Sequence, residues 1–268
     1  MAWREHRVRH FPGHWERLLC LLPFEPEYFA KHGLPATFVG HPVLESGAGD
    51  GNGARFRARH GIAADAKVVV LMPGSRRSEV PRLLPVFGET IRLLARDVPG
   101  VRPVLPVSSA VAYAVRQAAA GWPVAPIIVT ELEDKHDAYA AAGAALTKSG
   151  TSTLELALAG VPMAVTYRVN PLSAALARRL IRVPHVAMVN LLAERAVVPE
   201  LLQEDCTAEK LSATARRLLH DPAVAGAQRE AFRTVLAGLH PPGALPSEAA
   251  AREVLDVLDQ ARGDRATA

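Results

Sequence analysis

Strands and helices alternate along the central part of this chain, and this alternation limits its fold more than any other feature. The apolar run KVVVLM at 67–72 predicts a buried strand, and the helix expected over 79–97 carries Leu83 and Phe87 on its apolar face. Such alternation predicts right-handed βαβ units and a parallel sheet covered by helices on both faces, an α/β fold. Further strands are expected at 101–107, 125–130, 143–147 and 162–167, with helices at 108–120, 133–142, 153–159, 208–219, 221–238 and 246–262.

Composition excludes several classes of protein. Hydrophobic residues make up 49% and charged residues 22% of the 268 positions, which is typical of a globular chain. Apolar runs are too short for a membrane span, and two isolated cysteines, Cys20 and Cys206, predict neither a disulfide framework nor a metal site. We therefore expect a cytoplasmic protein without a metal. Aromatic residues are only 5% and no nucleic-acid motif is present, so nucleic acid is not an expected partner.

Two turns at strand ends carry the residues expected of an anion site. In parallel sheets, ligands bind beyond the carboxyl ends of the strands. The turn at 73–78, PGSRRS, offers a glycine, hydroxyls and arginine, whose planar fork matches phosphate oxygens. The turn at 149–152, SGTS, precedes a helix and frees backbone N–H groups. Together they predict a site for a nucleoside diphosphate. Neither matches a Walker or GxGxxG loop, so no adenylate-type cofactor is predicted.

Each turn also has a purely structural interpretation. Ser152-Thr153-Leu154-Glu155 fits a capping box, with serine at the N-cap and glutamate three residues later. Arg76 fits equally a surface residue that closes a turn. Both alternatives remain open at the level of sequence.

The glycine-rich stretch SGAGDGNG at 46–53 predicts a flexible connector between two packed regions. Near the end of the chain, HPPG at 240–243 separates the last two helices. We therefore expect packed regions on both sides of residues 46–53 and a separate last helix.

Several stretches, taken in order, resemble the lipid-A-disaccharide synthase family. They are AWREHRV (2–8), FVGHPVLE (38–45), LMPGSRRSEV (71–80), LTKSGTSTLELALAGVPMAVTYRVNPL (146–172) and VNLLAERAVVPELLQEDCTAEKL (189–211). The resemblance implies a glycosyltransferase with two Rossmann-like domains, the GT-B type, and an active site between them. It implies transfer of 2,3-diacylglucosamine from its UDP derivative to 2,3-diacylglucosamine 1-phosphate, with release of UDP.

The resemblance also implies a division of the chain. In the family, a segment like AWREHRV lies late in the N-terminal domain. Residues 1–45 are therefore expected to be a remnant of the N-terminal acceptor domain, 46–240 the UDP-sugar donor-binding domain, and 241–268 a C-terminal helix. Two alternatives stay open: an inactive UDP-binding fragment, or another UDP-N-acetylglucosamine enzyme of the same fold.

The resemblance assigns roles to the first turn. Arg76, with Gly74 and Ser75, would bind the diphosphate and stabilise negative charge on the leaving UDP, which lowers the barrier to glycosyl transfer. Arg76 is accordingly the expected catalytic residue, and no Asp-x-Asp metal motif accompanies it.

Further substrate-binding positions follow the second turn. Ser149, Gly150 and Thr151 would place backbone N–H groups on the phosphates. Glu155, five residues before Gly160, would accept hydrogen bonds from both ribose hydroxyls.

Two other positions have competing interpretations. Asn190 is expected on a loop after a strand near 185–189, either close to the donor or in an ordinary turn. His41 is expected to pack at the hinge between domains rather than to act chemically.

Charged groups elsewhere are less specific. Glu200, Gln203 and Glu204 are expected on a solvated helix face. A helix around Arg178, Arg179 and Arg182 either faces the core or rests on an anionic membrane surface that supplies acylated substrates. We therefore expect a cytoplasmic protein that could lie peripherally on the inner membrane, and the C-terminal helices could exchange between the subunits of a homodimer.

Overall fold

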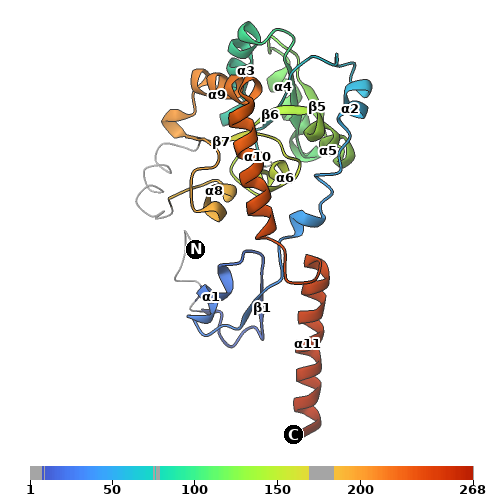
Figure 1. The fold of residues 1–268 in the computed structure, drawn as a ribbon, viewed down its shortest axis with the longest axis vertical. Coiled ribbons are helices and arrows are strands. Elements are labelled where there is room, and N and C mark those ends of the chain that lie inside the picture. The colour runs from blue at the N-terminus through green and yellow to red at the C-terminus, as the bar shows by residue number, and fades with distance from the viewer. Residues whose placement is uncertain (1–7, 9, 75, 77–78, 169–183, 268) are drawn as a thin grey trace.

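The computed structural model describes residue 8 and residues 10–74, 76, 79–168 and 184–267 (Figure 1). Ser75, Arg77 and the basic stretch that contains Arg178, Arg179 and Arg182 lie outside the described residues. A larger lobe occupies the top of Figure 1, a small lobe with the first helix lies below it, and the last helix runs downward.

The larger lobe is built on a parallel sheet, which has six strands in the described part of the chain. Its order is β5-β4-β3-β6-β7-β8, and every neighbouring pair is parallel. The chain moves outward from β3 to β5 and then crosses back to β6, so the strand order reverses between β3 and β6. The predicted parallel α/β sheet is confirmed. The strands are β3 (Val68–Met72), β4 (Arg102–Pro106), β5 (Ile127–Val129), β6 (Ala142–Lys148), β7 (Met163–Tyr167) and β8 (Glu200–Leu202).

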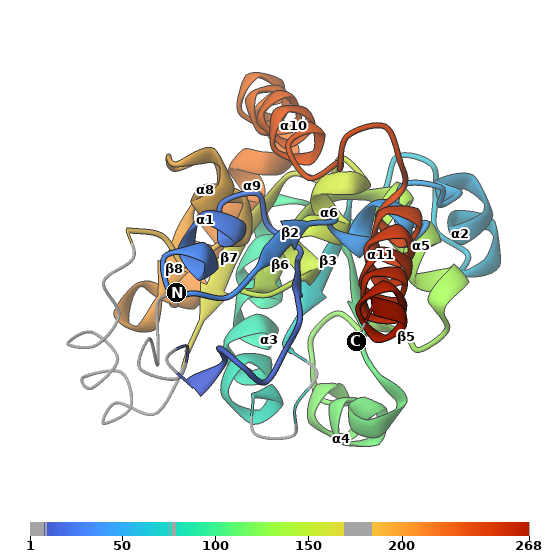
Figure 2. The same cartoon turned by 90° about the horizontal axis from the view of Figure 1, so that it is seen from below.

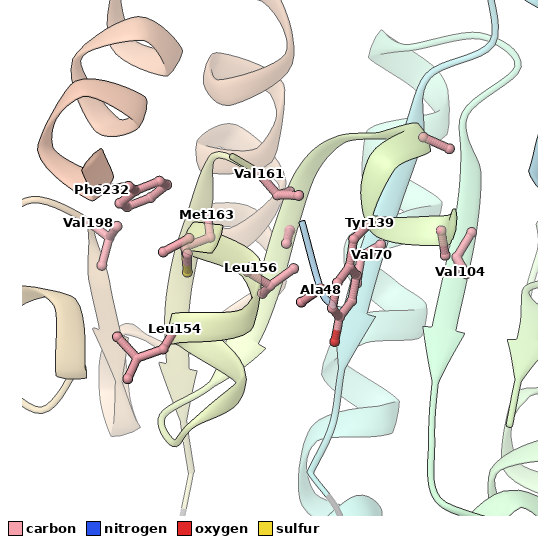
Figure 3. Packing of buried hydrophobic residues seen from close by; sticks show 14 of the residues in the cluster. Ala48, Val70, Val104, Tyr139, Leu154, Leu156, Val161, Met163, Val198 and Phe232 are labelled. Carbon is pink, nitrogen blue, oxygen red and sulfur yellow. The ribbon is translucent and has the colours of Figure 1, made fainter. Parts of the chain in front are cut away.

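Helices cover both faces of this sheet because its strands are apolar on both sides. Val69 and Leu71 of β3 pack into the cluster that includes Leu83 and Phe87, on the face covered by α3 (Val80–Asp97), α4 (Ser109–Ala119) and α9 (Ala208–His220). Alternate residues pack into a second cluster on the opposite face, part of which Figure 3 shows. That face is covered by α2 (Gly53–Arg59), α5 (Leu132–Ala141), α6 (Ser152–Leu158), α8 (Met188–Ala193) and α10 (Pro222–Ala237).

The structure corrects the prediction for the region after residue 184. A strand was expected near 185–189, with Asn190 on the following loop, but Asn190 lies inside α8. The last strand of the sheet is instead β8, so Glu200 is a strand residue and not part of a solvated helix face; Gln203 begins a 3-10 turn, Gln203–Asp205. The Glu200 carboxylate accepts hydrogen bonds from the backbone N–H groups of Val186 and Ala187, at the start of α8. This helix start therefore depends on a side chain more than ten residues away.

The glycine-rich stretch 46–53 is packed and not a flexible connector. A Cβ atom on Gly51 would lie 2.0 Å from the carbonyl oxygen of His136, and one on Gly53 would lie 2.7 Å from that of Ala140. The backbone N–H of Asn52 donates to the buried Asp137 carboxylate at 2.6 Å. Gly51 and Gly53 allow the backbone of this stretch to pack closely against α5, because only a residue without a side chain fits at these positions.

The small lobe has its own apolar cluster of Val8, Cys20, Phe29 and Leu34. It contains β1 (Leu18–Cys20), α1 (Glu25–Ala30) and β2 (Ala36–Phe38), and β1 pairs parallel to β2. Figure 2, which views the molecule from below, shows α1 on the side of α8 and α11 (Pro246–Thr267) on the side of α5.

Residues 40–45 join the two lobes. The backbone N–H of His41 donates to the carbonyl of Leu239 at 3.1 Å, and Gly40 lies so close to Pro241 that a Cβ atom would meet its ring at 2.5 Å. Glu45, in the 3-10 turn Pro42–Glu45, accepts from both the backbone N–H and the hydroxyl of Ser247. Among the described helices, none is long and apolar enough to cross a membrane.

Candidate functional site

The carboxyl ends of β3, β4, β5 and β6 surround a cleft of about 530 Å³. It lies where the strand order reverses, the position at which open parallel sheets bind ligands. Both turns predicted from the sequence reach it. The residues that line it are Met72, Gly74, Arg76, Pro106, Val107, Ser108, Val129, Thr130, Leu132, Lys135, Lys148, Ser149, Gly150, Thr151, Ser152 and Glu155.

The turn after β3 folds around the carboxylate of Glu79. Gly74 has a φ of +108°, and a Cβ atom on it would lie 2.4 Å from Glu79 Oε2, so both its conformation and its surroundings favour glycine. Glu79 Oε1 lies 3.0 Å from Arg76 Nη1 and 2.9 Å from Lys148 Nζ. Arg76 is thus at the mouth of the cleft, with a side chain that is 76% exposed.

Lys148 and Arg76 keep Glu79 ionised. Burial by itself raises the pKa of the Glu79 carboxyl, but the hydrogen bond and charge of Lys148, together with the contacts from Arg76, outweigh this effect and hold the pKa below its ordinary value. The turn therefore carries a fixed negative charge between two cations.

The turn after β6 leaves donors free. The Ser149 hydroxyl donates to the carbonyl of Val186 at 2.7 Å, so this side chain holds the turn against the segment before α8. The backbone N–H groups of Gly150 and Thr151 have no acceptor among the residues that the structure describes. The N-cap of α6 is Thr151 and not Ser152, and it makes no side-chain cap hydrogen bond. The capping box that the sequence left open is not formed.

Glu155 instead points to α5. Its carboxylate accepts from Lys135 Nζ at 3.0 Å and from the hydroxyl of Tyr139 at 3.1 Å. Burial, reinforced by the charge of Glu155, raises the pKa of Tyr139 well above its ordinary value, so this phenol stays a donor. Glu155 lines the cleft and is therefore held in a fixed orientation at its wall.

Asn190 is not among the residues that line the cleft. It is fully buried, its side-chain amide donates to the carbonyl of Val198 and to Glu200, and its oxygen accepts from the N–H groups of Val197 and Val198. All its hydrogen-bonding groups are thus used inside the protein. Its link to the cleft is indirect. Asn190 donates to Glu200, Glu200 accepts the backbone N–H of Val186, and the carbonyl of Val186 accepts the hydroxyl of Ser149 in the cleft wall.

Three further charged residues at the site, Glu79, Lys135 and Lys148, were not predicted from the sequence. Lys148 had a local signal, because it is a charged residue at the end of a mostly apolar strand, directly before Ser149. Lys135 and Glu79 had none, since their role depends on partners in other elements. Among the described lining residues, the cleft has three cations, Arg76, Lys135 and Lys148, and one carboxylate, Glu155. This balance of charge suits an anionic ligand. No cluster that could hold a metal ion occurs within the described residues.

Solved structures resemble this chain in fold. The S. aureus MnaA–UDP co-structure superposes with a TM-score of 0.62 at 14% identity, over 87% of this chain and 58% of that one. A sucrose-phosphate synthase from Thermosynechococcus elongatus gives a TM-score of 0.54 at 15% identity, over 97% of this chain and 62% of that one. At such low identity these likenesses concern the fold alone, and they agree with the GT-B type expected from the sequence.

Sequence relatives are much closer. The lipid-A-disaccharide synthase of Gluconobacter oxydans is 61% identical over 97% of this chain, and that of Granulibacter bethesdensis is 59% identical over 97%. The chain spans 62% and 69% of the length of these two relatives. The family model described as lipid-A-disaccharide synthetase matches residues 1–254. With almost the whole sequence matched and the cleft at the expected strand ends, the chain belongs to the lipid-A-disaccharide synthase family.

Proposed function

We propose that this chain supplies the donor-binding part of a glycosyltransferase of lipid A synthesis. It transfers 2,3-diacylglucosamine from its UDP derivative to 2,3-diacylglucosamine 1-phosphate and releases UDP. In this proposal residues 46–240 bind the UDP-sugar, residues 1–45 belong to the acceptor domain, and residues 241–268 form the C-terminal helix. The reaction takes place in the cytoplasm, where acylated substrates are collected at the membrane surface.

One observation carries the proposal. The two glycine-bearing turns, which are more than seventy residues apart in sequence, line one cleft where the strand order reverses, and Arg76 and Lys148 lie between them. The diphosphate of UDP carries several negative charges, and guanidinium and ammonium groups bind such oxygens with charge-assisted hydrogen bonds. The backbone N–H groups of Gly150 and Thr151, which have no acceptor among the described residues, add to this binding.

The same groups favour the reaction. Glycosyl transfer places negative charge on the departing diphosphate as the bond to the sugar breaks. Fixed cations at that position stabilise the transition state more than the ground state, and the barrier falls. Arg76 is the residue to which we assign this role, with Lys148, which pairs with the same oxygen of Glu79, as its neighbour.

Glu155 recognises the nucleoside in this proposal. An ionised carboxylate accepts from two adjacent hydroxyls at once, which matches the 2′ and 3′ hydroxyls of ribose. Lys135 and Tyr139 already hold the carboxylate in place, so little conformational freedom is lost on binding.

Titration of UDP into the protein by calorimetry tests the site. Arg76→Ala is expected to weaken UDP binding at least about tenfold, because a charge-assisted contact to phosphate is lost, while the fold stays intact. Arg92→Ala is the matched control, since Arg92 lies on α3, is not among the residues that line the cleft, and pairs with the surface residue Glu89. An unchanged dissociation constant for Arg76→Ala would remove Arg76 from the site.

A transfer assay on the same preparation separates the competing functions. Binding of UDP together with disaccharide formation supports the proposal. Binding without turnover identifies an inactive UDP-binding fragment. Failure to bind UDP contradicts the proposal and both alternatives.

A further inference from the structure

A second hollow of about 210 Å³ lies next to the cleft and shares two of its residues, Arg76 and Lys148. We call it the basic hollow. Its remaining charged or aromatic lining residues are Glu79, Arg82, Tyr167 and Arg168. It is formed by the turn after β3, the first turn of α3 and the end of β7.

The basic hollow carries uncompensated positive charge. Glu79, the one carboxylate among its described lining residues, is paired with both Arg76 and Lys148. Arg82 and Arg168, in contrast, form no ion pair with any residue that the structure describes. With four cations and one anion among its described lining residues, the hollow has a formal charge of +3.

These cations line a concavity and do not simply radiate into solvent. The Lys148 side chain is only 16% exposed, and its ammonium lies 5.3 Å from the centre of the Tyr167 ring. Charge gathered in a concave, partly buried site attracts anions more strongly than the same charge on an open surface. The guanidinium groups of Arg82 and Arg168, which have no ion-pair partner among the described residues, offer planar forks that match the oxygens of a phosphate.

We propose that the basic hollow binds a phosphomonoester, and that in the reaction proposed above this group is the 1-phosphate of the acceptor. The second half of this statement rests on the proposed function. A phosphomonoester is close to a dianion at neutral pH and so suits a site with a charge of +3. A volume of about 210 Å³ has room for a phosphate and part of its sugar, whereas the larger cleft takes the nucleoside diphosphate.

The arrangement has a consequence for the reaction. Arg76 and Lys148 lie between the two sites, so each would be flanked by the donor diphosphate on one side and the acceptor phosphate on the other. The basic hollow would thereby hold the acceptor beside the bond that breaks, which raises the rate by proximity. Arg82 and Arg168 line only the hollow and therefore allow it to be tested without altering the cleft.

The test is a calorimetric titration of glucosamine 1-phosphate into protein that is saturated with UDP, and also into protein without UDP. The double variant Arg82→Gln/Arg168→Gln is expected to weaken binding of glucosamine 1-phosphate at least tenfold and to change UDP affinity less than twofold. Arg92→Gln/Arg96→Gln on α3 is the matched control, because it removes the same charge, from +4 to +2 in the whole chain, outside the hollow. Thermal unfolding of each variant checks the fold, and Arg82→Gln alone serves if the double variant is unstable.

The outcomes are distinguishable. Loss of phosphomonoester binding in the hollow variant but not in the control supports the proposal. Equal loss in both variants, or no binding of glucosamine 1-phosphate to the wild-type protein at millimolar concentration, overturns it. Phosphomonoester binding that depends on Arg82 and Arg168 in a protein that does not bind UDP would keep the hollow as an anion site and contradict the proposed function.

Discussion

The Glu155 side chain in the cleft has a fixed orientation in the absence of a ligand. Its carboxylate is fixed by an ammonium from Lys135 and a phenol from Tyr139, both on α5. A fixed, ionised carboxylate discriminates well between ligands, because a partner that lacks the matching hydroxyls leaves a partly buried charge without compensation.

Replacement of this carboxylate gives a prediction at the scale of a residue. Wild-type protein is expected to bind UDP at least about tenfold more tightly than 2′,3′-dideoxyuridine diphosphate, since two charge-assisted hydrogen bonds are lost with the hydroxyls. Glu155→Gln is expected to bind both nucleotides with similar, weaker affinity. Calorimetric titration of both ligands measures the ratio. If Glu155→Gln keeps the wild-type ratio, Glu155 does not contact the ribose.

The residues of the site differ in how far sequence reveals them. Gly74, Arg76 and Gly150 were predicted to converge because the ends of parallel strands share one edge of a sheet, and all three line the cleft. Lys135 was not predicted to reach the cleft, because its contact with Glu155 depends on how α5 packs beside α6. Asn190 was expected near the donor, yet its partners are backbone groups and the Glu200 carboxylate, which only the folded chain brings together.

At the scale of elements, local periodicity predicted nearly every strand and helix of the larger lobe. The exceptions are α8, where a strand was expected, β8, where a helix face was expected, and α2, for which no helix was predicted. The segment AMVNLLA is apolar enough for a strand or a helix. Glu200 favours the helix, because its carboxylate accepts the backbone N–H groups at the helix start. A short segment of this kind takes its structure from tertiary contacts that no local pattern contains.

Glycines in the stretch 46–53 give a prediction for the packing of α2 and its connector on α5. Gly51→Ala would place a methyl group 2.0 Å from the carbonyl oxygen of His136, so backbone must move. We expect a loss of at least about 2 kcal/mol in the free energy of unfolding. Urea unfolding followed by circular dichroism measures it.

Gly226→Ala is the matched control for this prediction. Gly226 lies within α10, and nothing is within 4 Å of the position that a Cβ atom would take. Alanine is the better helix former, so the free energy of unfolding is expected to rise by about 0.5–1 kcal/mol. Equal stability of Gly51→Ala and wild-type protein would show that the close approach is not needed.

For the whole molecule, the sequence predicted the sheet but not how the lobes meet. Alternation of strands and helices, with the right-handed crossover rule, predicted five of the six parallel strands in the described part of the chain, all except β8. The junction is different, because it joins residues 40–45 to residues 239–247 across almost the entire chain. Contacts of this range follow from the completed fold.

We expect His41 to make the stability of this junction depend on pH. It is buried, its Nδ1 accepts the backbone N–H of Val43 at 3.0 Å, and burial holds its pKa below the ordinary value. The folded state therefore prefers neutral His41, whereas the unfolded chain takes up a proton below about pH 6.5. The contribution of neutral His41 to the free energy of unfolding is therefore fully present above that pH. It falls as the pH drops toward the lower pKa of His41 in the folded state. The pKa of His136 is also lowered, mainly by burial, and acts in the same direction.

Thermal unfolding between pH 7.5 and pH 5 tests this role of His41. The Tm of wild-type protein is expected to fall by a few degrees over this range, at about 2–4 °C for each kcal/mol. His41→Asn should show a smaller fall, because an asparagine oxygen can accept the same Val43 N–H but does not titrate. His240→Asn, which removes an exposed histidine beside the same junction, should follow the wild-type profile. If the Tm of His41→Asn falls as far as that of wild-type protein over this pH range, protonation of His41 does not weaken the contact between the lobes.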